Sequence, residues 1–136
     1  MPLLSVAGCI TAKLGLGIRT GVISNIGMSG VALSNRIKRL LPYNKFEFII
    51  ASSEYVFRKP HKRIFEIALK KAQLQSDDVW YCGDNILCDV EGAKAYGITP
   101  IWYTGAITRD TVSVPDSCLE ISDWYELSEI VSRLCA

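Results

Sequence analysis

The sequence is poor in features that several classes of protein require. Its 15 basic and 14 acidic residues give a formal net charge of +1, whereas proteins that neutralise many nucleic-acid phosphates usually carry a basic excess. It has one histidine, no Cys-x-x-Cys pair and no cysteine–histidine cluster, which disfavours a zinc site. No apolar run approaches the ~20 residues that a helix needs to cross a bilayer. We therefore expect neither a nucleic-acid partner nor a membrane.

The cysteines do not form the pattern of a disulfide framework. There are five of them, at positions 9, 82, 88, 118 and 135, and an odd number without framework spacing predicts reduced thiols in a cytoplasmic protein. The stretch LSVAGC, which ends at Cys9, looks like the end of a lipoprotein signal. A signal peptide needs a basic segment and about 7–15 apolar residues before cleavage. The few residues before LSVAGC cannot supply these, so we expect no lipidation.

The glycines of GLGIRTG, residues 15–21, lack the context of a dinucleotide-binding loop. Such a loop follows a strand and opens a helix, whereas these glycines precede the strand-like run GVIS. We interpret them as a helix end and a turn. This disfavours an oxidoreductase with a nucleotide cofactor.

Strand-like and helix-like segments alternate along the chain. The expected strands are residues 18–24, 46–51, 79–82 and 99–103, with a short one at 118–121. The expected helices are residues 3–14, 29–41, 60–72 and 86–96, and a last one capped by Ser122 or Asp123; residues 104–117 are expected to form a loop. The alternation predicts an α/β fold, with a Rossmann-like parallel sheet and helices on both faces. The length and the 49% apolar content fit a single domain over residues 1–136.

Apolar residues spaced by three and four positions predict which side of each helix faces the core. The expected inward residues are Leu33, Ile37, Leu40 and Leu41; then Ile64, Phe65, Ala68, Leu69 and Ala72; and in the last helix Trp124, Leu127, Ile130, Val131 and Leu134.

Polar side chains follow three of the expected strands. Ser24 and Asn25 follow the first, Lys59 lies beyond the second, and Asp84 and Asp89 follow the third. In a parallel sheet these positions meet at the carboxyl edge, where ligands bind. A hydroxyl, an ammonium group and two carboxylates suit a phosphoryl group held with Mg²⁺.

Each of these pieces also has a simpler interpretation. Ser24-Asn25 can be an ordinary turn. Asp84 and Asp89 can be a turn residue and an acid in the first turn of a helix. Cys82 and Cys88, which flank this loop, fit buried structural thiols.

The basic run RKPHKR, residues 58–63, can be a solvated charged surface. It falls at an expected helix N-terminus, where cations oppose the helix dipole and a bound anion would offset that cost. We expect only Lys59 to point into the site. Arg58, His61, Lys62 and Arg63 are expected at the surface.

Three motifs in order, ISN, RKP and GDNILCD, resemble those of the haloacid dehalogenase-like hydrolase superfamily, especially its phosphatase-type members. The resemblance covers about residues 18–103 and implies a Rossmann-like core that uses Mg²⁺. It implies that Ser24, with Asn25 beside it, binds phosphate and that Lys59 stabilises the phosphoryl group and the nucleophile. It also implies Asp84 as a metal ligand, with Asp89 as a second ligand or an anchor behind the ligands.

The family's first motif, DxDx(T/V), has no counterpart in the chain. No two of its aspartates are separated by one residue, and no acidic residue precedes Ser24. In the family that motif supplies the nucleophile and part of the metal site, on a central strand. We expect the chain to be the C-terminal part of a longer phosphatase, without a cap domain and inactive by itself.

The missing motif also implies a gap in the sheet, between the strands at 18–24 and 79–82, that some other strand must fill. The N-terminal stretch LLSVA is one candidate, and a strand from a homodimer or another partner chain is the other. The leading functional hypothesis is a hydrolase lineage that acts on a small phosphomonoester. The alternative is a non-catalytic module that binds phosphate or completes another chain.

Overall fold

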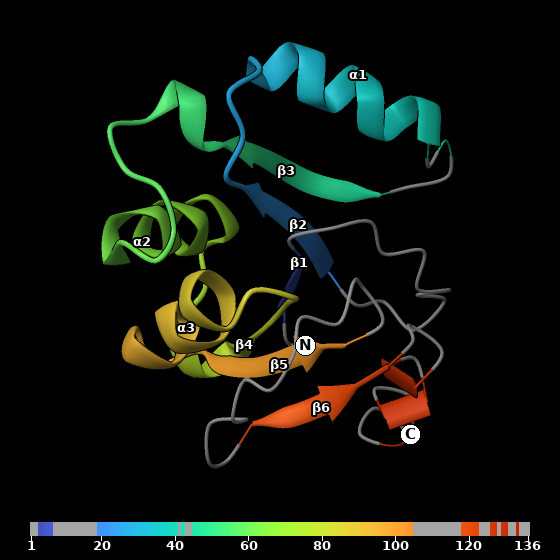
Figure 1. The fold of residues 1–136 in the computed structure, drawn as a ribbon, viewed down its shortest axis with the longest axis vertical. Helices are drawn as coiled ribbons and strands as arrows, with labels where there is room; N and C mark the ends of the chain where they lie inside the picture. Colours follow the sequence, from blue (N-terminus) through green and yellow to red (C-terminus); the bar gives the residue numbers. More distant parts are fainter. Residues whose placement is uncertain are drawn as a thin grey trace.

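The computed structural model describes residues 3–6, 19–40, 42, 45–104, 118–122, 126–127, 129–130 and 133. Their strands form one six-stranded sheet with the order β3-β2-β1-β4-β5-β6, and every neighbouring pair is parallel (Figure 1). The strands are β1 (Leu3–Val6), β2 (Arg19–Ser24), β3 (Phe46–Ala51), β4 (Val79–Gly83), β5 (Thr99–Tyr103) and β6 (Leu119–Ile121). The predicted α/β class with a parallel sheet is confirmed, and no cap domain is present among the described residues.

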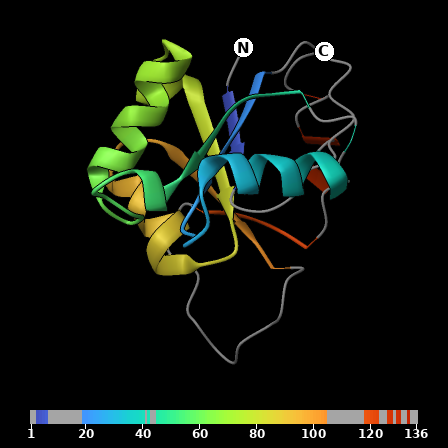
Figure 2. The ribbon, with the colours of Figure 1, turned by 90° about the horizontal axis from the view of Figure 1, so that it is seen from above.

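Helices cover both faces of the sheet. The longer ones are α1 (Gly30–Leu40) and α2 (Lys62–Ala72); α3 (Gly92–Ala95) continues a π-helical segment, η3 (Ile86–Glu91). Two short 3₁₀ turns, η1 (Ser52–Glu54) and η2 (Ser76–Asp78), precede α2 and β4. Figure 2 shows α2 and α3 together and α1 apart from them.

Two buried clusters correspond to the two faces. One joins α2 and α3 to the sheet through Ile23, Ile50, Ile64, Phe65, Ala68, Leu69, Ala72, Val79, Tyr81, Ala93 and Ile98. The other joins α1 to β2 and β3 through Val22, Leu33, Ile37 and Ala51. Neighbouring strand residues such as Val22 and Ile23 enter opposite clusters, because successive side chains of a strand point to opposite faces.

The prediction of a helix over residues 3–14 is wrong where the structure tests it. Leu3–Val6 form β1, which pairs with β2 on one side and β4 on the other. Residues 7–14, which include Cys9, lie outside the described residues. Tertiary contacts decide this conformation, because a strand between β2 and β4 satisfies the backbone hydrogen-bonding groups of both neighbours. The suggestion that LLSVA fills the middle of the sheet is confirmed for Leu3–Val6.

The two long helices differ from the prediction at their ends. Leu40 was expected to face the core, but it lies in the last turn of α1 and is 60% exposed; Leu41 lies outside the described residues. Helix α2 begins at Lys62 with His61 as its N-cap, so Pro60 is not in its first turn. Pro60 instead follows a cis peptide bond from Lys59. The five residues expected to face the core from α2 are all buried.

The C-terminal half follows the expected order. The segment 86–96 is helical but starts as a π-helix, and Gly97 ends it at a positive φ of 85°, a value that glycine adopts without strain. Leu127 is buried as expected, while Trp124, Val131, Leu134 and most of the expected loop at 104–117 lie outside the described residues. No described helix is long and apolar enough to span a membrane.

Candidate functional site

The site lies at the carboxyl edge of the sheet, where the chain leaves β2, β3 and β4. Strand β2 ends at Ser24, which pairs with Ala51 at the end of β3, and β4 ends at Gly83. Because the strands are parallel, the loops that follow them meet at one edge. These loops carry Asn25, Lys59, Asp84 and Asp89, as the sequence predicts.

A buried ion pair lies at the centre of this edge. Lys59 Nζ lies 2.5 Å from Asp89 Oδ1, and the two residues are 4% and 2% exposed. The two side chains come from different parts of the fold, the loop before α2 and segment η3. The pair therefore joins the loop after β3 to the loop after β4. A buried pair of this kind is costly to desolvate unless further hydrogen bonds satisfy it.

The Asp89 carboxylate receives those further hydrogen bonds. Tyr81 OH donates to Oδ1 at 3.2 Å, and the backbone N–H of Asn85 donates to Oδ2 at 3.1 Å. Gly83 allows this close approach, because a Cβ there would overlap the Asp89 side chain. Both carboxylate oxygens thus accept from protein donors.

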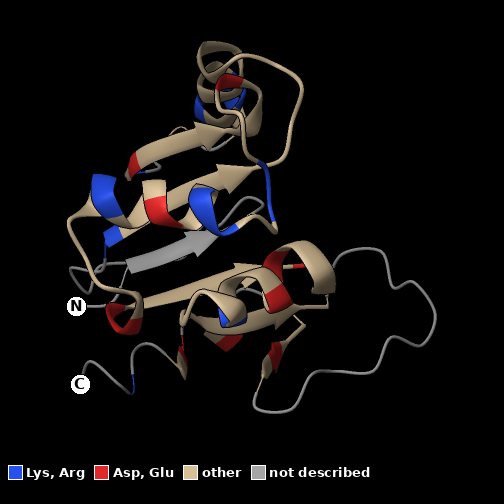
Figure 3. Ribbon diagram, turned by 90° about the vertical axis from the view of Figure 1, so that its left-hand side faces the viewer, with Lys and Arg blue, Asp and Glu red and all other residues tan. Residues whose placement is uncertain are grey.

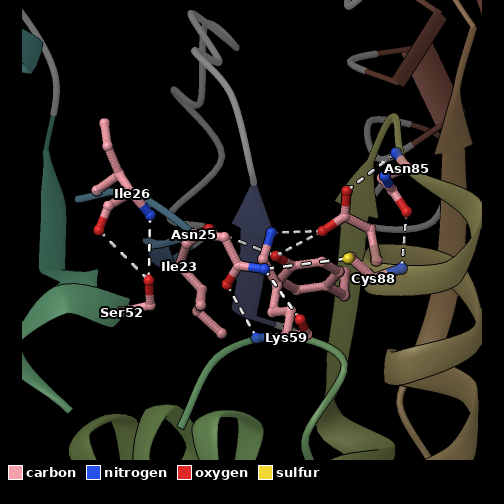
Figure 4. Close-up of polar contacts among 9 residues, drawn as sticks. Ile23, Asn25, Ile26, Ser52, Lys59, Asn85 and Cys88 are labelled. Atoms are coloured by element: carbon pink, nitrogen blue, oxygen red, sulfur yellow. Dashed lines mark hydrogen bonds and ion pairs between the residues drawn. The ribbon is translucent and has the colours of Figure 1, made fainter. Parts of the chain in front are cut away.

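The side chain of Asn25 both donates to and accepts from the backbone of Lys59. Its Nδ2 donates to Lys59 O at 2.9 Å, and its Oδ1 accepts from Lys59 N at 2.9 Å. Figure 4 shows these two contacts, together with a longer one from Nδ2 to Cys88 Sγ. The Asn25 side chain therefore fixes the loop that presents Lys59. The amide nitrogen of Asn25 has a second proton, whose contact is the long one to Cys88 Sγ, and this proton could face a phosphate oxygen while both Lys59 bonds are kept.

The side chains of Ser24 and Asp84 differ from those of the buried pair, because they are more exposed and bond to none of the described residues. Ser24 is half-buried and Asp84 is exposed, and neither side chain hydrogen-bonds or pairs with any of the described residues. The backbone of Asp84 is anchored, since Trp102 Nε1 donates to its carbonyl oxygen at 3.0 Å. The hydroxyl of Ser24 and the carboxylate of Asp84 can therefore meet a ligand without breaking a contact with the described residues.

The Asp84 carboxylate could serve as one ligand of Mg²⁺. Mg²⁺ keeps several waters and is usually bound through one or two carboxylates. The Asp84 carboxylate has no bond to the described residues, whereas Asp89 already accepts from Lys59, Tyr81 and Asn85. Within the described residues no cluster of three or more histidine, cysteine, aspartate or glutamate side chains could hold a metal.

Burial also shifts the proton affinities of two groups near the site. Burial, and then the negative charge of Asp89, raise the pKa of Tyr81 well above its usual value. Burial likewise raises the pKa of the Cys82 thiol. Tyr81 thus stays a hydrogen-bond donor at neutral pH and Cys82 stays a neutral thiol, as the interpretation of a structural cysteine requires.

The rest of the RKPHKR run faces solvent. Arg58, His61, Lys62 and Arg63 are exposed, and His61 Nδ1 accepts from Arg63 N as the cap of α2. Helix α2 carries one acidic residue between basic residues at its two ends (Figure 3), and this residue, Glu66, forms ion pairs of 3.0 Å with Arg63 and 3.2 Å with Lys70. Only Lys59 of this run is buried in the site, as expected.

Sequence reasoning missed Tyr81 and Trp102. Tyr81 carried a usable signal: a tyrosine in a strand expected to be buried on both faces needs a partner for its hydroxyl. Trp102 carried none, because its contact with the Asp84 backbone depends on how β5 lies beside β4.

Comparisons with known proteins agree with this geometry. Residues 12–103 match the family model described as haloacid dehalogenase-like hydrolase. A glyceraldehyde 3-phosphate phosphatase of Pyrococcus abyssi is 33% identical over 88 residues, which are 65% of this chain and 36% of the relative. The human haloacid dehalogenase-like hydrolase domain-containing protein 3 is 33% identical over 102 residues, 73% of this chain and 39% of the relative.

A solved structure shares the fold at greater coverage. The 2-haloacid dehalogenase of Pseudomonas syringae pv. Tomato DC3000 superposes with a TM-score of 0.70 and 26% identity over 91% of this chain and 51% of that one. The chain thus spans about a third to a half of the length of these proteins. The parallel sheet, the three motifs at its edge and the match over residues 12–103 lead to one conclusion: the chain belongs to the haloacid dehalogenase-like hydrolase family.

Proposed function

We propose that the chain forms the phosphate-binding and metal-binding part of a phosphatase that acts on a small phosphomonoester. Ser24 donates its hydroxyl to a phosphate oxygen, and Lys59 places its positive charge beside the same group. Asp84 supplies one ligand to Mg²⁺, and Asp89 is the anchor of Lys59 rather than a second ligand. Asn25 contributes by holding the Lys59 backbone. Bound Mg²⁺ would add positive charge next to the phosphoryl oxygens.

The observation that carries this proposal is the buried Lys59–Asp89 pair at the carboxyl edge of the sheet. Replacing such a pair by well-packed apolar residues is often neutral or stabilising by about 1–4 kcal/mol, so stability alone does not account for a buried lysine here. The loops that carry Lys59 and Asp89 lie at the same edge of the sheet as Ser24 and Asp84, whose side chains bond to none of the described residues. This supports a site for an anion that is bound together with a cation.

Reaction by this chain requires a group that its 136 residues do not contain. Covalent phosphoryl transfer needs a nucleophile, and the aspartate pair that supplies it in the family is absent from the sequence. We therefore propose that the chain binds phosphate but does not turn over phosphomonoesters. The cytoplasmic location and the absence of nucleic-acid partners stay predictions.

The test is a binding and activity measurement on the same preparation. In a ¹H–¹⁵N NMR titration with inorganic phosphate and MgCl₂ at constant ionic strength, we expect shifts at Ser24, Lys59 and Asp84. Lys59→Met should abolish them, and Lys70→Met, an exposed lysine of α2, should not. No hydrolysis of p-nitrophenyl phosphate above the buffer rate is expected. Turnover that disappears in Asp84→Asn would overturn the proposed inactivity.

A second candidate function is suggested by β1. This strand is described over four residues and lies between β2 and β4 in the middle of the sheet. A central position held by so short a strand is open to replacement by a strand from another chain, as in other strand-addition interfaces. Analytical ultracentrifugation tests this: a monomer at all micromolar concentrations, alone and with a peptide in which an apolar strand ends in Asp-x-Asp, argues against it.

A further inference from the structure

Tyr81 contacts both members of the buried ion pair. Its side chain is 1% exposed, its hydroxyl lies 3.2 Å from Asp89 Oδ1, and Lys59 Nζ lies 5.4 Å from the centre of its ring. We propose that Tyr81 is a positioning residue, whose hydroxyl orients the Asp89 carboxylate so that the Lys59 ammonium group can face a bound phosphoryl group. This inference rests on the proposed phosphate site.

The hydroxyl of Tyr81 has two acceptors within reach and one proton. Asp89 Oδ1 lies at 3.2 Å and Ile23 O at 3.5 Å. A nearer, charged oxygen forms the stronger hydrogen bond, so the Tyr81 hydroxyl donates its proton to the hydrogen bond with Asp89 Oδ1. Burial and the neighbouring carboxylate raise the pKa of Tyr81, which keeps that proton in place.

Asp89 needs this donor because its carboxylate turns easily. The torsion that rotates an aspartate carboxylate is broad, and the oxygens of Asp89 are fixed by Tyr81 and Lys59 at Oδ1 and by Asn85 at Oδ2. Without the Tyr81 hydroxyl, Oδ1 accepts from Lys59 only, and the carboxylate can turn to take more of the ammonium protons. A lysine has three such protons, so each one given to Asp89 is lost to a phosphate oxygen.

The ring of Tyr81 is held independently of its hydroxyl. It meets Phe65 of α2 edge-on, with ring centroids 5.3 Å apart at 82°. Tyr81→Phe therefore removes one oxygen and keeps the packing. Tyr96 offers a matched control, since it stacks on the same Phe65 at 6.5 Å and 22°, and its hydroxyl bonds to no residue in the described part of the chain.

The experiment compares wild type, Tyr81→Phe and Tyr96→Phe by two NMR measurements. The first is the affinity for inorganic phosphate at constant ionic strength. Tyr81→Phe should bind about tenfold more weakly, the effect of losing about one charge-assisted hydrogen bond, and Tyr96→Phe should match wild type. The second is the ¹⁵N signal of the Lys59 ammonium group without phosphate. It should shift in Tyr81→Phe and stay unchanged in Tyr96→Phe.

The two measurements separate this inference from the proposed function. Unchanged phosphate affinity and an unchanged Lys59 signal in Tyr81→Phe overturn the positioning role. Absence of phosphate binding by wild type removes the proposed function, and the Lys59 signal then decides the role of Tyr81. If Tyr81→Phe does not fold, the hydroxyl proton of Tyr81 in wild type decides: slow exchange with water supports the bond to Asp89, and fast exchange overturns it.

Discussion

The buried charges of Lys59 and Asp89 account for much of the local structure around them. An isolated buried charge is unfavourable, and a pair is stable only when other donors satisfy its remaining lone pairs. Tyr81 OH and the Asn85 backbone supply those donors to Asp89, and Asn25 fixes the backbone that carries Lys59. Two side chains and one backbone N–H, from three separate segments, thus support one ion pair.

Gly83 is the position where one added carbon should disturb this arrangement most. A Cβ at Gly83 would overlap Cβ, Cγ and Oδ2 of Asp89, and Asp89 cannot retreat without moving the pair with Lys59. We expect Gly83→Ala to lower the free energy of unfolding by about 1–3 kcal/mol, as for other overpacked sites. Urea unfolding measures the stability, and phosphate titration measures the loss of affinity that the displaced Lys59 should cause.

Gly27 provides the control for that substitution. It lies in the loop after β2, and a Cβ there would meet nothing within 4 Å. Gly27→Ala should change the stability by less than about 0.5 kcal/mol. If the two alanine variants have the same stability and the same phosphate affinity, the close packing of Gly83 against Asp89 is contradicted.

At this scale the sequence predicted positions better than contacts. The order of the motifs was enough to place Lys59, Asp84 and Asp89 beyond the ends of strands, and Ser24 at the end of one. It did not predict that the side chain of Asn25 bonds to the backbone of Lys59, because that contact depends on the path of the loop between η1 and α2. For the same reason it left Asp89 as either a second metal ligand or an anchor behind the ligands, whereas in the structure the oxygens of Asp89 accept from three protein donors.

Among the elements, η1 holds the loop that follows β2. Ser52 Oγ accepts from Ile26 N at 3.1 Å (Figure 4), Ser53 Oγ donates to Met28 O at 2.5 Å, and Glu54 Oε1 accepts from Gly30 N at 2.5 Å. A carboxylate at the N-terminus of α1 is also favoured by the helix dipole. The turn after β3 therefore fixes the loop that begins at Ser24.

At the opposite edge of the sheet, Arg19 joins three elements. Its guanidinium bonds to both carboxylate oxygens of Glu47 at 2.9 Å and to Ala72 O at 2.7 Å. The hydrogen bond from Arg19 lowers the pKa of Glu47 from its ordinary 4.5. Because the folded pKa is the lower one, this contribution to stability is present above about pH 4.5 and disappears as the pH falls through the folded value.

Glu47→Gln should therefore be less sensitive to acid than wild type. We expect its free energy of unfolding to fall less steeply below pH 5, and the two proteins to converge at the acid end, because protonation removes the same charge. Glu120→Gln is the control, since Glu120 is exposed on β6 and forms no ion pair in the described part of the chain. Chemical unfolding between pH 3 and pH 7 gives the comparison; equal slopes for all three proteins count against the prediction.

The element boundaries show where periodicity ceases to be informative. Apolar spacing correctly placed Leu33 and Ile37 of α1 in the core, but at Leu40 the helix is ending and its last turn faces solvent. At residues 3–6 the spacing indicated a helix, and the structure has a strand. There, partners far along the chain decide the conformation: β2 and β4 both need a hydrogen-bonding neighbour, and no pattern within the segment itself reports that need.

In the whole molecule, β1 connects two halves of the sheet that each supply part of the site. Strands β2 and β3 lie on one side of it, and β4, β5 and β6 on the other. Lys59 follows β3 and Asp89 follows β4, so the ion pair joins the two halves of the sheet at its carboxyl edge. The geometry of the site thus depends on a four-residue strand.

Ser5 is the position at which this dependence can be tested. It pairs with Gly21 of β2 and with Tyr81 of β4. Proline has no N–H and cannot join the ladder of a central strand. Ser5→Pro should lower the free energy of unfolding by about 2–3 kcal/mol, because it removes one backbone hydrogen bond and strains its neighbours.

Ser5→Ala keeps the backbone donor and should unfold close to wild type, so the contrast between the two variants isolates the main chain. If Leu3–Val6 hold the two halves of the sheet together, Ser5→Pro should also weaken phosphate binding, although Ser5 lies within β1 and is not one of the proposed site residues. Equal stability of Ser5→Pro and wild type would mean that this segment does not support the sheet in solution. The gap between β2 and β4 would then be available to a strand from another chain, and the second candidate function would gain over the first.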